Sequence, residues 1–597
     1  MANRPLKNDA SPPKTDPIAL ATTWHYLQRV CREMRDTVER TASNVLATSL
    51  HDLAYGIWDA QGRVIAIPEG FPCRLISSTF PIKAVIRRFG KDILPGDVFL
   101  TNDPFRAGAV HLPDWVFIRP IFFEDELVFF SCMGTHVPDN GGARPGTYFL
   151  AYDSIAEGLN IPPIKLVQQG TMREDLLELI LANNRLPDMM RRETYSLIGS
   201  TAVADRRLTE LLHKYGKGTV LNSLEEMFNR TEKAVRAEIA RWPDGTYSAE
   251  ARTDDDGARL GDPVTIRCSL HIQGDEATFD FSESDEQREG YINGHYSLVL
   301  SDVLCASFLF LDPGLAAYHN EGSIRPFHVI CRKGTVTDAR PGALTAGAPS
   351  IVGAMVIEAV LSTLSQALPE RAVTPYGRPL HLMFIGRDPR TGEVYTDVSF
   401  CPAGGAGAVH GYDGYQCCCE LGALGVVSKT DAEEEMVRFP WRVRRYEFLT
   451  DSAGAGKWRG APGIWWEGVN EGDDCASTMG PCDGWHTQGG GQQGGHPTPF
   501  NHARVLRGSE HIEITHPHVI QNLKANDVFI AKSGGGAGVG RPEERDPEAV
   551  RLDVKNELVS LRAARETYKV VLDPDTLEID NSATKTLRSE HHGVSRP

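Results

Sequence analysis

The sequence predicts an α+β protein, in which helices and antiparallel sheets are mixed and the C-terminal half is β-rich and glycine-rich. Three observations support this class. Apolar residues recur every three or four positions over long stretches of the first 245 residues, which is the period of an amphipathic helix. Between residues 246 and 285 the period shortens to two, as in a half-buried strand. From Pro375 to Asp575, short apolar runs alternate with glycine-rich segments.

A chain of 597 residues is long enough to form several packed domains. Shifts in composition and period predict a disordered tail over 1–17, an α+β domain over 18–245, a mixed α/β segment over 246–374, a β-rich domain over 375–579 and a disordered tail over 580–597. We find no internal repeat that would indicate a solenoid.

The α+β domain is expected to begin with a long helix and a hairpin. The predicted elements are, in order, a helix over 18–48, a hairpin over 50–67 with its turn at 59–62, a helix over 79–89 and a strand over 98–100. Residues 171–241 are expected to be mostly helical. Breaks are predicted at Pro187 and near Gly216, because proline and glycine interrupt helices.

The middle of the chain is predicted to change from strands to helices. Strands are expected over 246–285, and helices over 297–310 and 352–368. The segment Gly480–Pro499 is rich in glycine and low in apolar residues, so we expect a mobile loop there.

The bulk composition excludes some partners. A formal net charge of -17 argues against a nucleic-acid partner, since no broad basic face is available for phosphates. We find no apolar segment long enough to span a bilayer, and Met1–Pro17 lacks the apolar core of a signal peptide, so a cytoplasmic protein without a membrane partner is expected. The twelve cysteines are then expected to be reduced. Adjacent cysteines on a strand point to opposite faces, which favours packing over a zinc site at Cys417–Cys419.

The stretch from Thr101 to Gly142 predicts a hairpin. Two apolar runs, Trp115–Phe123 and Leu127–Met133, flank a polar turn centred on Asp125. In an antiparallel hairpin the numbers of paired residues add up to a constant, which is about 250 for this turn centre.

Asp114 and His136 satisfy this sum, so they should face each other at the open end of the hairpin. His111 lies just before Asp114 in the entering loop. Two imidazoles and one carboxylate form a ligand set that suits a divalent ion such as Mn, Zn or Fe. The alternative is that each side chain only forms hydrogen bonds at the end of a strand.

Two glycine-containing segments invite other interpretations. Gly534–Gly540 lacks the lysine–serine pair of a P-loop and the strand–turn–helix setting of a dinucleotide site, so we predict a structural glycine turn. Asp451–Gly460 contains Lys457 and Arg459, which are most simply solvated cations. Binding of a phosphate or of another subunit is the alternative.

An ordered series of short pieces resembles the hydantoinase B/oxoprolinase family, which includes N-methylhydantoinase B and the corresponding subunits of acetone and acetophenone carboxylases. Near the hairpin the matching pieces are Asn102-Asp103-Pro104, His111-Leu112-Pro113-Asp114, His136 with Asp139 and Gly141-Gly142, Glu157-Gly158-Leu159 and Ile161–Leu166. Further along they are Asp280-Phe281-Ser282, Asn320-Glu321-Gly322, Gly404–Ala408, Asp451–Gly460, Ser533–Gly536 and Tyr568–Leu572. The series covers nearly the whole chain, and its order is more specific than any one piece.

The resemblance implies that His111, Asp114 and His136 are the metal ligands. It also implies that Asp52 is a further ligand or a base. Asp103 and Asp139 then become candidates for orienting the two imidazoles, as second carboxylates do in many metal sites.

Two pieces depart from the pattern of the family. Ser49–Ala54, around Asp52, differs from the usual Glu-Arg-(Glu or Lys)-Asp-Phe-Ser. Arg74-Leu75-Ile76 stands where many members carry His-Leu-Gly, which removes a histidine useful to ring-opening members. This second departure favours a substrate other than hydantoin or oxoproline.

The resemblance further implies an A-type partner subunit with an actin-like ATPase core, with or without a small extra subunit. ATP on that partner would phosphorylate the carbonyl oxygen of a small substrate, because an unactivated ketone or amide is a poor electrophile. We expect the metal-bearing subunit to complete a ketone carboxylation with bicarbonate. The alternatives are hydrolysis of a cyclic amide (hydantoin, 5-oxoproline or a lactam) and a structural role in the same complex.

Overall fold

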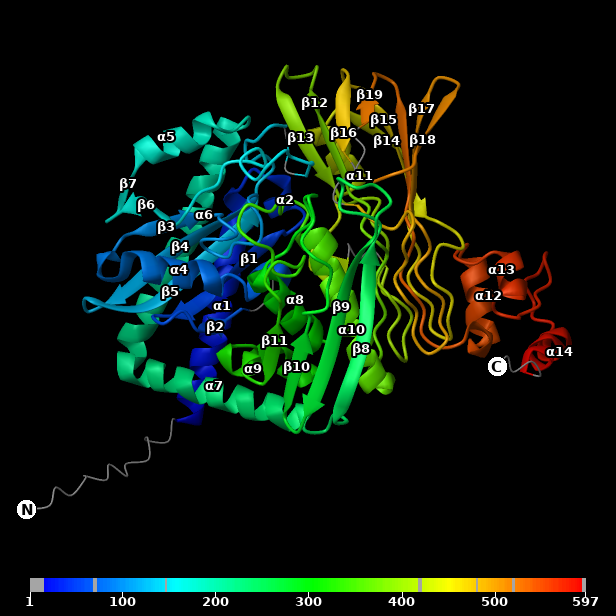
Figure 1. Ribbon diagram of the computed structural model, residues 1–597, viewed down its shortest axis with the longest axis horizontal. Helices are drawn as coiled ribbons and strands as arrows, with labels where there is room; N and C mark the ends of the chain where they lie inside the picture. Colours follow the sequence, from blue (N-terminus) through cyan, green and yellow to red (C-terminus); the bar gives the residue numbers. More distant parts are fainter. Residues whose placement is uncertain are drawn as a thin grey trace, which may run out of the picture.

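The computed structural model describes residues 16–67, 72–144, 146, 148–416, 421–478, 482–517 and 521–592. Within these residues the strands form four sheets, and Figure 1 shows the helices around them. The predicted α+β class is confirmed. The outermost parts of both predicted tails, 1–15 and 593–597, and the three cysteines 417–419 lie outside the described residues.

A seven-stranded sheet in the order β2-β1-β5-β4-β3-β6-β7 forms the centre of the N-terminal part. Its strands are β1 (Leu53–Asp59), β2 (Val64–Ala66), β3 (Val98–Thr101), β4 (Asp114–Phe123), β5 (Glu126–His136), β6 (Ile164–Gln168) and β7 (Thr171–Met172). All neighbouring strands are antiparallel. The predicted hairpin at 50–67 is confirmed as β1 and β2, and the predicted strand from Val98 as β3.

Long helices lie on one face of this sheet. α1 (Pro17–Thr41) and α6 (Pro187–Tyr215) pack against its strands, α7 (Lys217–Ile239) packs against α1 and α6, and α5 (Glu174–Ala182) packs against α6. The predicted helical breaks are confirmed, because α6 begins at Pro187 and Gly216, with a φ of 79°, separates α6 from α7. On the other face lie α3 (Pro72–Leu75) and α4 (Thr79–Phe89), of which α4 was predicted.

The helix predicted over 18–48 is interrupted. α1 ends at Thr41, and the short helix α2 (Val45–Thr48) begins after Asn44, whose side chain accepts a hydrogen bond from the Leu46 N–H. The buried carboxylate of Glu193, on α6, accepts the N–H groups of Ser43 and Asn44. The break was not predicted because the residue that holds it open lies about 150 positions away in the sequence.

A four-stranded sheet follows, in the order β11-β10-β9-β8. Its strands are β8 (Gly245–Thr253), β9 (Val264–Gln273), β10 (Glu276–Asp280) and β11 (Phe327–Ile330), and only β10 and β11 are parallel. The helices α8 (Tyr296–Phe308) and α10 (Ala354–Ala367) pack against this sheet, and the short α9 (Glu321–Ile324) lies against α7. The predicted strands over 246–285 and both predicted helices are confirmed.

The helix Pro349–Ala367 combines a π-helical turn with α10. Among the described residues it is the one helix long and apolar enough to cross a membrane by length and composition. The prediction that no segment reaches this length is wrong in that respect. Of its most apolar window, 89% is buried inside the protein, where it packs against α8, β8 and β9.

Two further antiparallel sheets share one apolar core in the C-terminal half. The first, in the order β13-β12-β16-β19, contains β12 (Leu382–Arg387), β13 (Val394–Ser399), β16 (Cys475–Thr478) and β19 (Gln521–Leu523). The second, in the order β14-β15-β20-β17-β18, contains β14 (Trp441–Phe448), β15 (Ile464–Asn470), β17 (His502–Arg507), β18 (Glu510–Ile514) and β20 (Val528–Lys532). Phe384, Trp441 and Trp466 stack between them, and α11 (Ala432–Arg438) lies beside β14.

Glycine-rich segments run side by side between β8 and the C-terminal helices, as wavy lines in Figure 1. We call them the glycine layer: residues 404–408, 454–463, 489–495 and 533–540. Gly536 N donates to Ala461 O, and Ala461 N donates to Ala406 O. A Cβ on Gly460 would lie 1.9 Å from Gly536 O. Close backbone approach therefore requires these glycines, and the turn predicted at Gly534–Gly540 is instead one chain of this layer.

The loop predicted to be mobile at Gly480–Pro499 is tied down over its described part, from Cys482 onward. The carboxylate of Asp254, just after β8, accepts the N–H groups of Trp485, His486 and Thr487 at 2.7, 3.0 and 2.7 Å. A carboxylate that satisfies three consecutive backbone donors holds a segment that has few apolar residues of its own.

The chain ends in three helices, α12 (Pro547–Lys555), α13 (Leu561–Glu566) and α14 (Asn581–His592). The prediction of a disordered tail from residue 580 is therefore wrong up to residue 592. Arg588 donates a hydrogen bond to Arg545 O, and Thr584 Oγ1 accepts the Val571 N–H. These tertiary hydrogen bonds hold a helix whose sequence is mostly polar.

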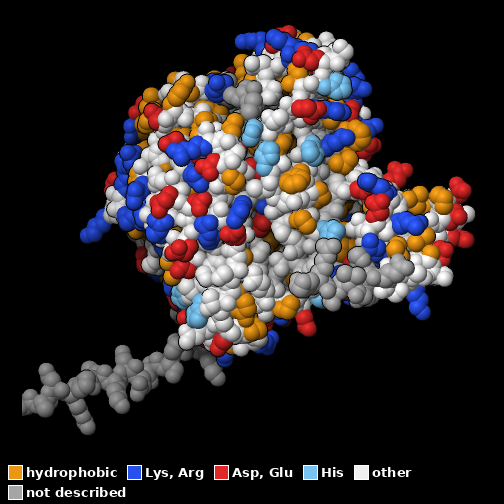
Figure 2. Space-filling view, turned by 45° about the vertical axis from the view of Figure 1, so that its right-hand side comes forward, with side chains coloured by type: hydrophobic (Ala, Val, Ile, Leu, Met, Phe, Trp, Pro, Cys, Tyr) orange, Lys and Arg blue, Asp and Glu red, His pale blue; other side chains and the backbone are white. Residues whose placement is uncertain are grey.

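The surface charges are mixed. On the face drawn in Figure 2, Lys and Arg side chains are interspersed with Asp and Glu side chains. This side of the molecule therefore carries both signs of charge side by side.

Candidate metal centre

The β4–β5 hairpin places Asp114 opposite His136, as the residue sum predicts. The pairs keep a sum of 250 from this open end as far as Ile121, where a bulge shifts the register by one. His111 lies one turn before Asp114, and the Asp114 N–H donates to His111 O at 3.0 Å. The turn folds the imidazole of His111 back over the end of β4.

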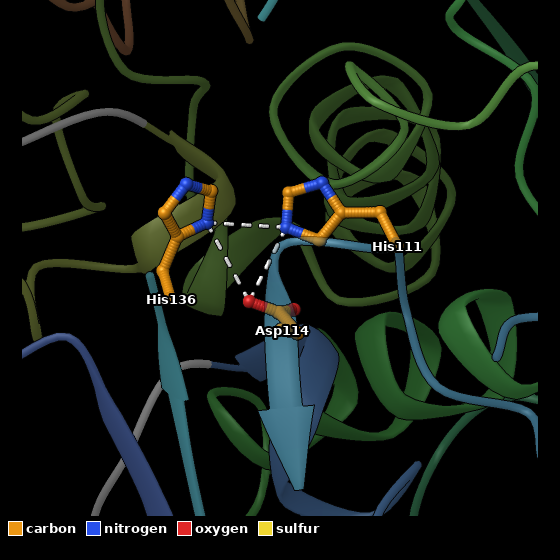
Figure 3. Close-up of side chains that lie close together, drawn as sticks. All are labelled: His111, Asp114 and His136. Atoms are coloured by element: carbon orange, nitrogen blue, oxygen red, sulfur yellow. Dashed lines mark hydrogen bonds and ion pairs between the residues drawn. The ribbon is translucent and has the colours of Figure 1, made fainter. Parts of the chain in front are cut away.

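The three side chains converge on one point, which Figure 3 shows. His111 Nε2 lies 3.2 Å from Asp114 Oδ1 and 3.2 Å from His136 Nδ1, and Asp114 Oδ1 lies 3.5 Å from His136 Nδ1. These three atoms all lie within 4.8 Å of one another, and each residue is at most 3% exposed. Two imidazole nitrogens and a carboxylate oxygen at this spacing fit a divalent ion.

The electrostatics favour the ligand forms of these groups. Burial by itself would raise the pKa of Asp114. The charge of Arg74 and the contacts with the two imidazoles oppose this and hold the pKa well below its usual value. Burial lowers the pKa of His136 to about 4, against a smaller raising effect of Asp114. Near pH 7 the site therefore contains an ionised carboxylate and a neutral His136 imidazole, which are the forms that bind metal ions.

A backbone carbonyl fixes the orientation of His111. His111 Nδ1 lies 2.7 Å from Ala346 O, in the loop before the π-helical turn. A carbonyl only accepts hydrogen bonds, so Nδ1 carries the proton and the Nε2 lone pair faces the centre. The ring of Tyr148 stacks on His136, with 5.2 Å between centroids and 24° between planes, and closes that side of the site.

Asp52, the proposed fourth ligand or base, is separated from the three convergent atoms by Arg74. The Arg74 guanidinium contacts the carboxylate of Asp52, and its Nη1 lies 2.9 Å from Asp114 Oδ1. Arg74 is buried on α3. In the sequence this arginine was only a departure from the family pattern, whereas in the fold it is the counter-charge of two carboxylates at the site.

Asp103 and Asp139 were predicted to orient the two imidazoles, but their hydrogen bonds go to nearby loops instead. Asp103 Oδ1 accepts the N–H groups of Phe105 and Arg106 at 2.9 and 2.8 Å. Asp139 accepts the N–H of Gly146 at 3.2 Å, and the N–H and guanidinium of Arg185 at 2.9 and 3.1 Å. Both carboxylates shape the loops around the site, and the Ala346 carbonyl orients His111 instead.

The sequence missed Arg74, Tyr148 and the Ala346 carbonyl as parts of the site. Arg74 could have been noticed as a charged residue inside an otherwise apolar segment. A backbone carbonyl leaves no trace in a sequence, so no pattern could have identified Ala346.

Lys457 and Arg459 were predicted to be solvated cations, and for Arg459 this is wrong because its side chain is buried. Arg459 Nη2 lies 2.8 Å from Asp553 Oδ1, in the buried contact between the glycine layer and α12. The guanidinium of Arg459 therefore forms an ion pair inside this chain. Lys457 lies over the ring of Trp458, with Nζ 4.8 Å from the centroid.

Comparison with known proteins agrees with this fold. The family model for hydantoinase B/oxoprolinase matches residues 16–542. The chain is 32% identical over 584 residues to the beta subunit of the caprolactamase of Pseudomonas jessenii, an alignment that covers 96% of this chain and 99% of that one. The crystal structure of the ATP-dependent caprolactamase from the same organism matches with a TM-score of 0.88 and 30% identity, over 96% of this chain and 100% of that chain.

Two further relatives differ in their reactions. The B-type subunit of a putative D-/L-hydantoinase from Pseudomonas sp. (strain NS671) is 27% identical over 605 residues, or 96% of this chain and 98% of that one. The delta subunit of the acetophenone carboxylase of Aromatoleum aromaticum is 24% identical over 594 residues, or 91% and 85%. The family match and the near-complete coverage lead to one conclusion: the chain belongs to the hydantoinase B/oxoprolinase family.

Proposed function

We propose that this chain is the metal-bearing subunit of an ATP-dependent, multi-subunit enzyme that hydrolyses a cyclic amide. The observation that carries the proposal is the convergence of His111, Asp114 and His136 in a chain that matches a caprolactamase subunit over nearly its full length. Mn, Zn and Fe all accept this ligand set.

The relatives favour hydrolysis over the ketone carboxylation that the sequence led us to expect. Identity falls from 32% with the caprolactamase subunit and 27% with the hydantoinase subunit to 24% with the carboxylase subunit. The departure at Arg74–Ile76 therefore has less weight than the sequence prediction assigned to it. The alternative from the sequence, cyclic amide hydrolysis, becomes the main proposal.

The chemistry that a divalent ion supplies in such a site is activation of water for attack on a carbonyl carbon. The residues of this chain hold the three ligand groups in position for such an ion. Asp114 supplies the negative charge, and the Ala346 carbonyl keeps the proton of His111 on Nδ1. Arg74 Nη1 contacts Asp114 Oδ1, the same oxygen that faces the two imidazoles, and its charge keeps the carboxylate ionised. Burial of the three side chains strengthens every charge interaction among them.

We assign activation of the carbonyl to a partner subunit of the A-type. An amide carbonyl is a poor electrophile, and phosphorylation of its oxygen by ATP makes its carbon more reactive. The matched caprolactamase is ATP-dependent, and the matched chain is one of its subunits, which supports an ATP-using partner for this chain too.

The test is an ATPase panel on the complex purified with its partner subunit. Lactams, hydantoins and 5-oxoproline are compared with acetone and acetophenone, each with and without bicarbonate. We expect ATP turnover that needs a cyclic amide, does not respond to bicarbonate and is accompanied by a ring-opened amino acid. Turnover that requires both a ketone and bicarbonate would establish carboxylation instead.

Variants separate catalysis from a structural role. Asp114→Asn and His136→Ala should abolish turnover without dissociating the complex. The matched control is His271→Ala, on the exposed face of β9. Full turnover by His136→Ala in an assembled complex would show that the site serves structure only.

A further inference from the structure

The orientation of His111 depends on a peptide segment that comes from far along the chain. Ala346 O, which holds His111 Nδ1 at 2.7 Å, lies 235 residues away in the sequence. The segment around Ala346 is not part of a regular helix or strand, so no hydrogen-bond ladder fixes the direction of its carbonyl. Other contacts must hold it.

One of these contacts is the carboxylate of Glu157. Glu157 Oε1 accepts the N–H groups of Thr345 and Ala346, both at 2.8 Å. The other is backbone packing, since Gly347 N donates to Tyr291 O at 2.8 Å and a Cβ on Gly347 would lie 2.7 Å from the Tyr291 ring. Together they fix the peptide groups on both sides of Ala346.

The backbone that carries Glu157 is itself held in place. It belongs to the loop that follows the hairpin, and a Cβ on Gly142 would lie 2.8 Å from both Ala156 O and Glu157 O. The loop is thus packed against the segment that directly follows His136 along the chain. Glu157 therefore connects the loop that follows β5 to the segment at Ala346.

Burial of the Glu157 carboxyl disfavours its ionised form. Glu157 is 4% exposed, and burial raises its pKa to about 8 against the lowering effect of the two backbone N–H groups. Its described partners are the N–H groups of Thr345 and Ala346 and the side chain of Thr345, and none of them is the guanidinium or ammonium that usually compensates a buried carboxylate. A buried carboxyl group whose partners all lie in one segment is explained by its contacts with that segment, here Thr345 and Ala346.

We propose that Glu157 is a positioning residue of the metal centre: it sets the direction of the Ala346 carbonyl and thereby keeps His111 Nε2 turned toward the ion. The inference rests on the proposed function, because it presumes that the centre binds a metal. Glu157 accepts the N–H groups of Thr345 and Ala346, and neither of these residues is a metal ligand, so its effect passes through one backbone segment.

The test measures the affinity of the purified complex for Co²⁺ by competition with a chelator, together with the visible absorption spectrum of the Co²⁺ complex. Glu157→Ala should weaken affinity about 10- to 100-fold, the range seen when an outer partner of a ligand is removed. Glu157→Gln should stay near the wild type, because its amide oxygen accepts the same two hydrogen bonds. Changed band positions in Glu157→Ala would report a reoriented ligand.

Asp97→Ala is the matched control. Asp97 is also a fully buried carboxylate that accepts two backbone N–H groups, from Leu94 and Gln169. It differs in an added ion pair with Lys165, and it lies at the opposite end of β3 from the site. It should lose stability and keep its Co²⁺ affinity and spectrum. Equal losses of affinity in Asp97→Ala and Glu157→Ala would mean that Glu157 is merely structural, and the inference would fail.

Two further outcomes are decisive. If Glu157→Ala does not fold, Glu157→Asp takes its place. Its shorter side chain should move the carbonyl and weaken Co²⁺ binding, and wild-type affinity in that variant would overturn the inference. Absence of Co²⁺ binding by the wild-type complex would instead overturn the proposed function. The two failures are therefore distinguishable.

Discussion

Asp114 and His136 lie directly opposite each other at the open end of the β4–β5 hairpin, with 3.5 Å between Asp114 Oδ1 and His136 Nδ1. Because the pair is set by the register of one hairpin, the site depends on a short piece of chain. The imidazole of His111 is added by the turn that enters the hairpin. The remaining contacts, from Arg74 and the Ala346 carbonyl, come from other segments of the chain.

Removal of one ligand should remove the metal. The complex with Asp114→Asn is expected to contain far less metal than the wild type, since the neutral amide no longer supplies the negative charge among the three groups. Elemental analysis after extensive dialysis measures the metal per chain. His271→Ala should retain the wild-type content, and an unchanged content in Asp114→Asn would mean that the ion binds elsewhere.

The pH dependence of stability should change in Glu157→Gln. The pKa of Glu157 is raised from its ordinary value of 4.5 to about 8 in the folded chain, so the folded state holds this proton more tightly than the unfolded state. Wild-type stability should therefore fall as pH rises between these values and level off above about 8. The variant lacks this titration.

We therefore expect the difference in unfolding temperature, variant minus wild type, to increase from pH 5 to pH 8 and then to stay constant. Thermal unfolding of both proteins in matched buffers measures it. A difference that does not vary with pH would show that Glu157 keeps an ordinary pKa.

Adding a methyl group within the glycine layer should destabilise the C-terminal half. In Gly460→Ala the new Cβ would lie 1.9 Å from Gly536 O, and two backbone segments would have to separate. The expected cost is about 3 kcal/mol or more, at the upper end of overpacking effects. Chemical denaturation followed by tryptophan fluorescence measures this loss.

Gly199→Ala is the control for this prediction. Gly199 lies inside α6, and a Cβ there meets no atom within 4 Å. Alanine favours helix over glycine by up to about 1 kcal/mol, so this variant should be as stable as the wild type or more stable. Equal stability of Gly460→Ala and the wild type would contradict the close packing of the layer.

Loss of Asp553 should release the C-terminal helices. Asp553 accepts from Arg459 Nη2 at 2.8 Å and from Arg545 Nη2 at 2.8 Å, and all three side chains are buried. Asp553→Ala would leave two guanidinium groups without this partner, at a cost of about 3–5 kcal/mol. Hydrogen exchange should then accelerate in α12 to α14. Glu548→Ala, which removes an exposed ion pair with Arg551, should leave exchange unchanged.

Local spacing in the sequence determined much of this fold. The turn centre at Asp125 predicted the pairing of Asp114 with His136, and Pro187 and Gly216 predicted the limits of α6. These features depend on periodicity and backbone preferences that act between near neighbours in the chain. An ordered series of motifs was also sufficient to recognise the family.

The tertiary structure decided the surroundings of the site and the long-range exceptions. Glu193 interrupts the first helix, Arg74 balances the two carboxylates, and Glu157 with the Ala346 carbonyl orients His111. Each of these contacts joins residues that are distant in sequence, and some use only backbone atoms. Patterns of side chains in the sequence cannot predict contacts of backbone atoms between distant segments. Packing between separate elements brings these atoms together only in the folded chain.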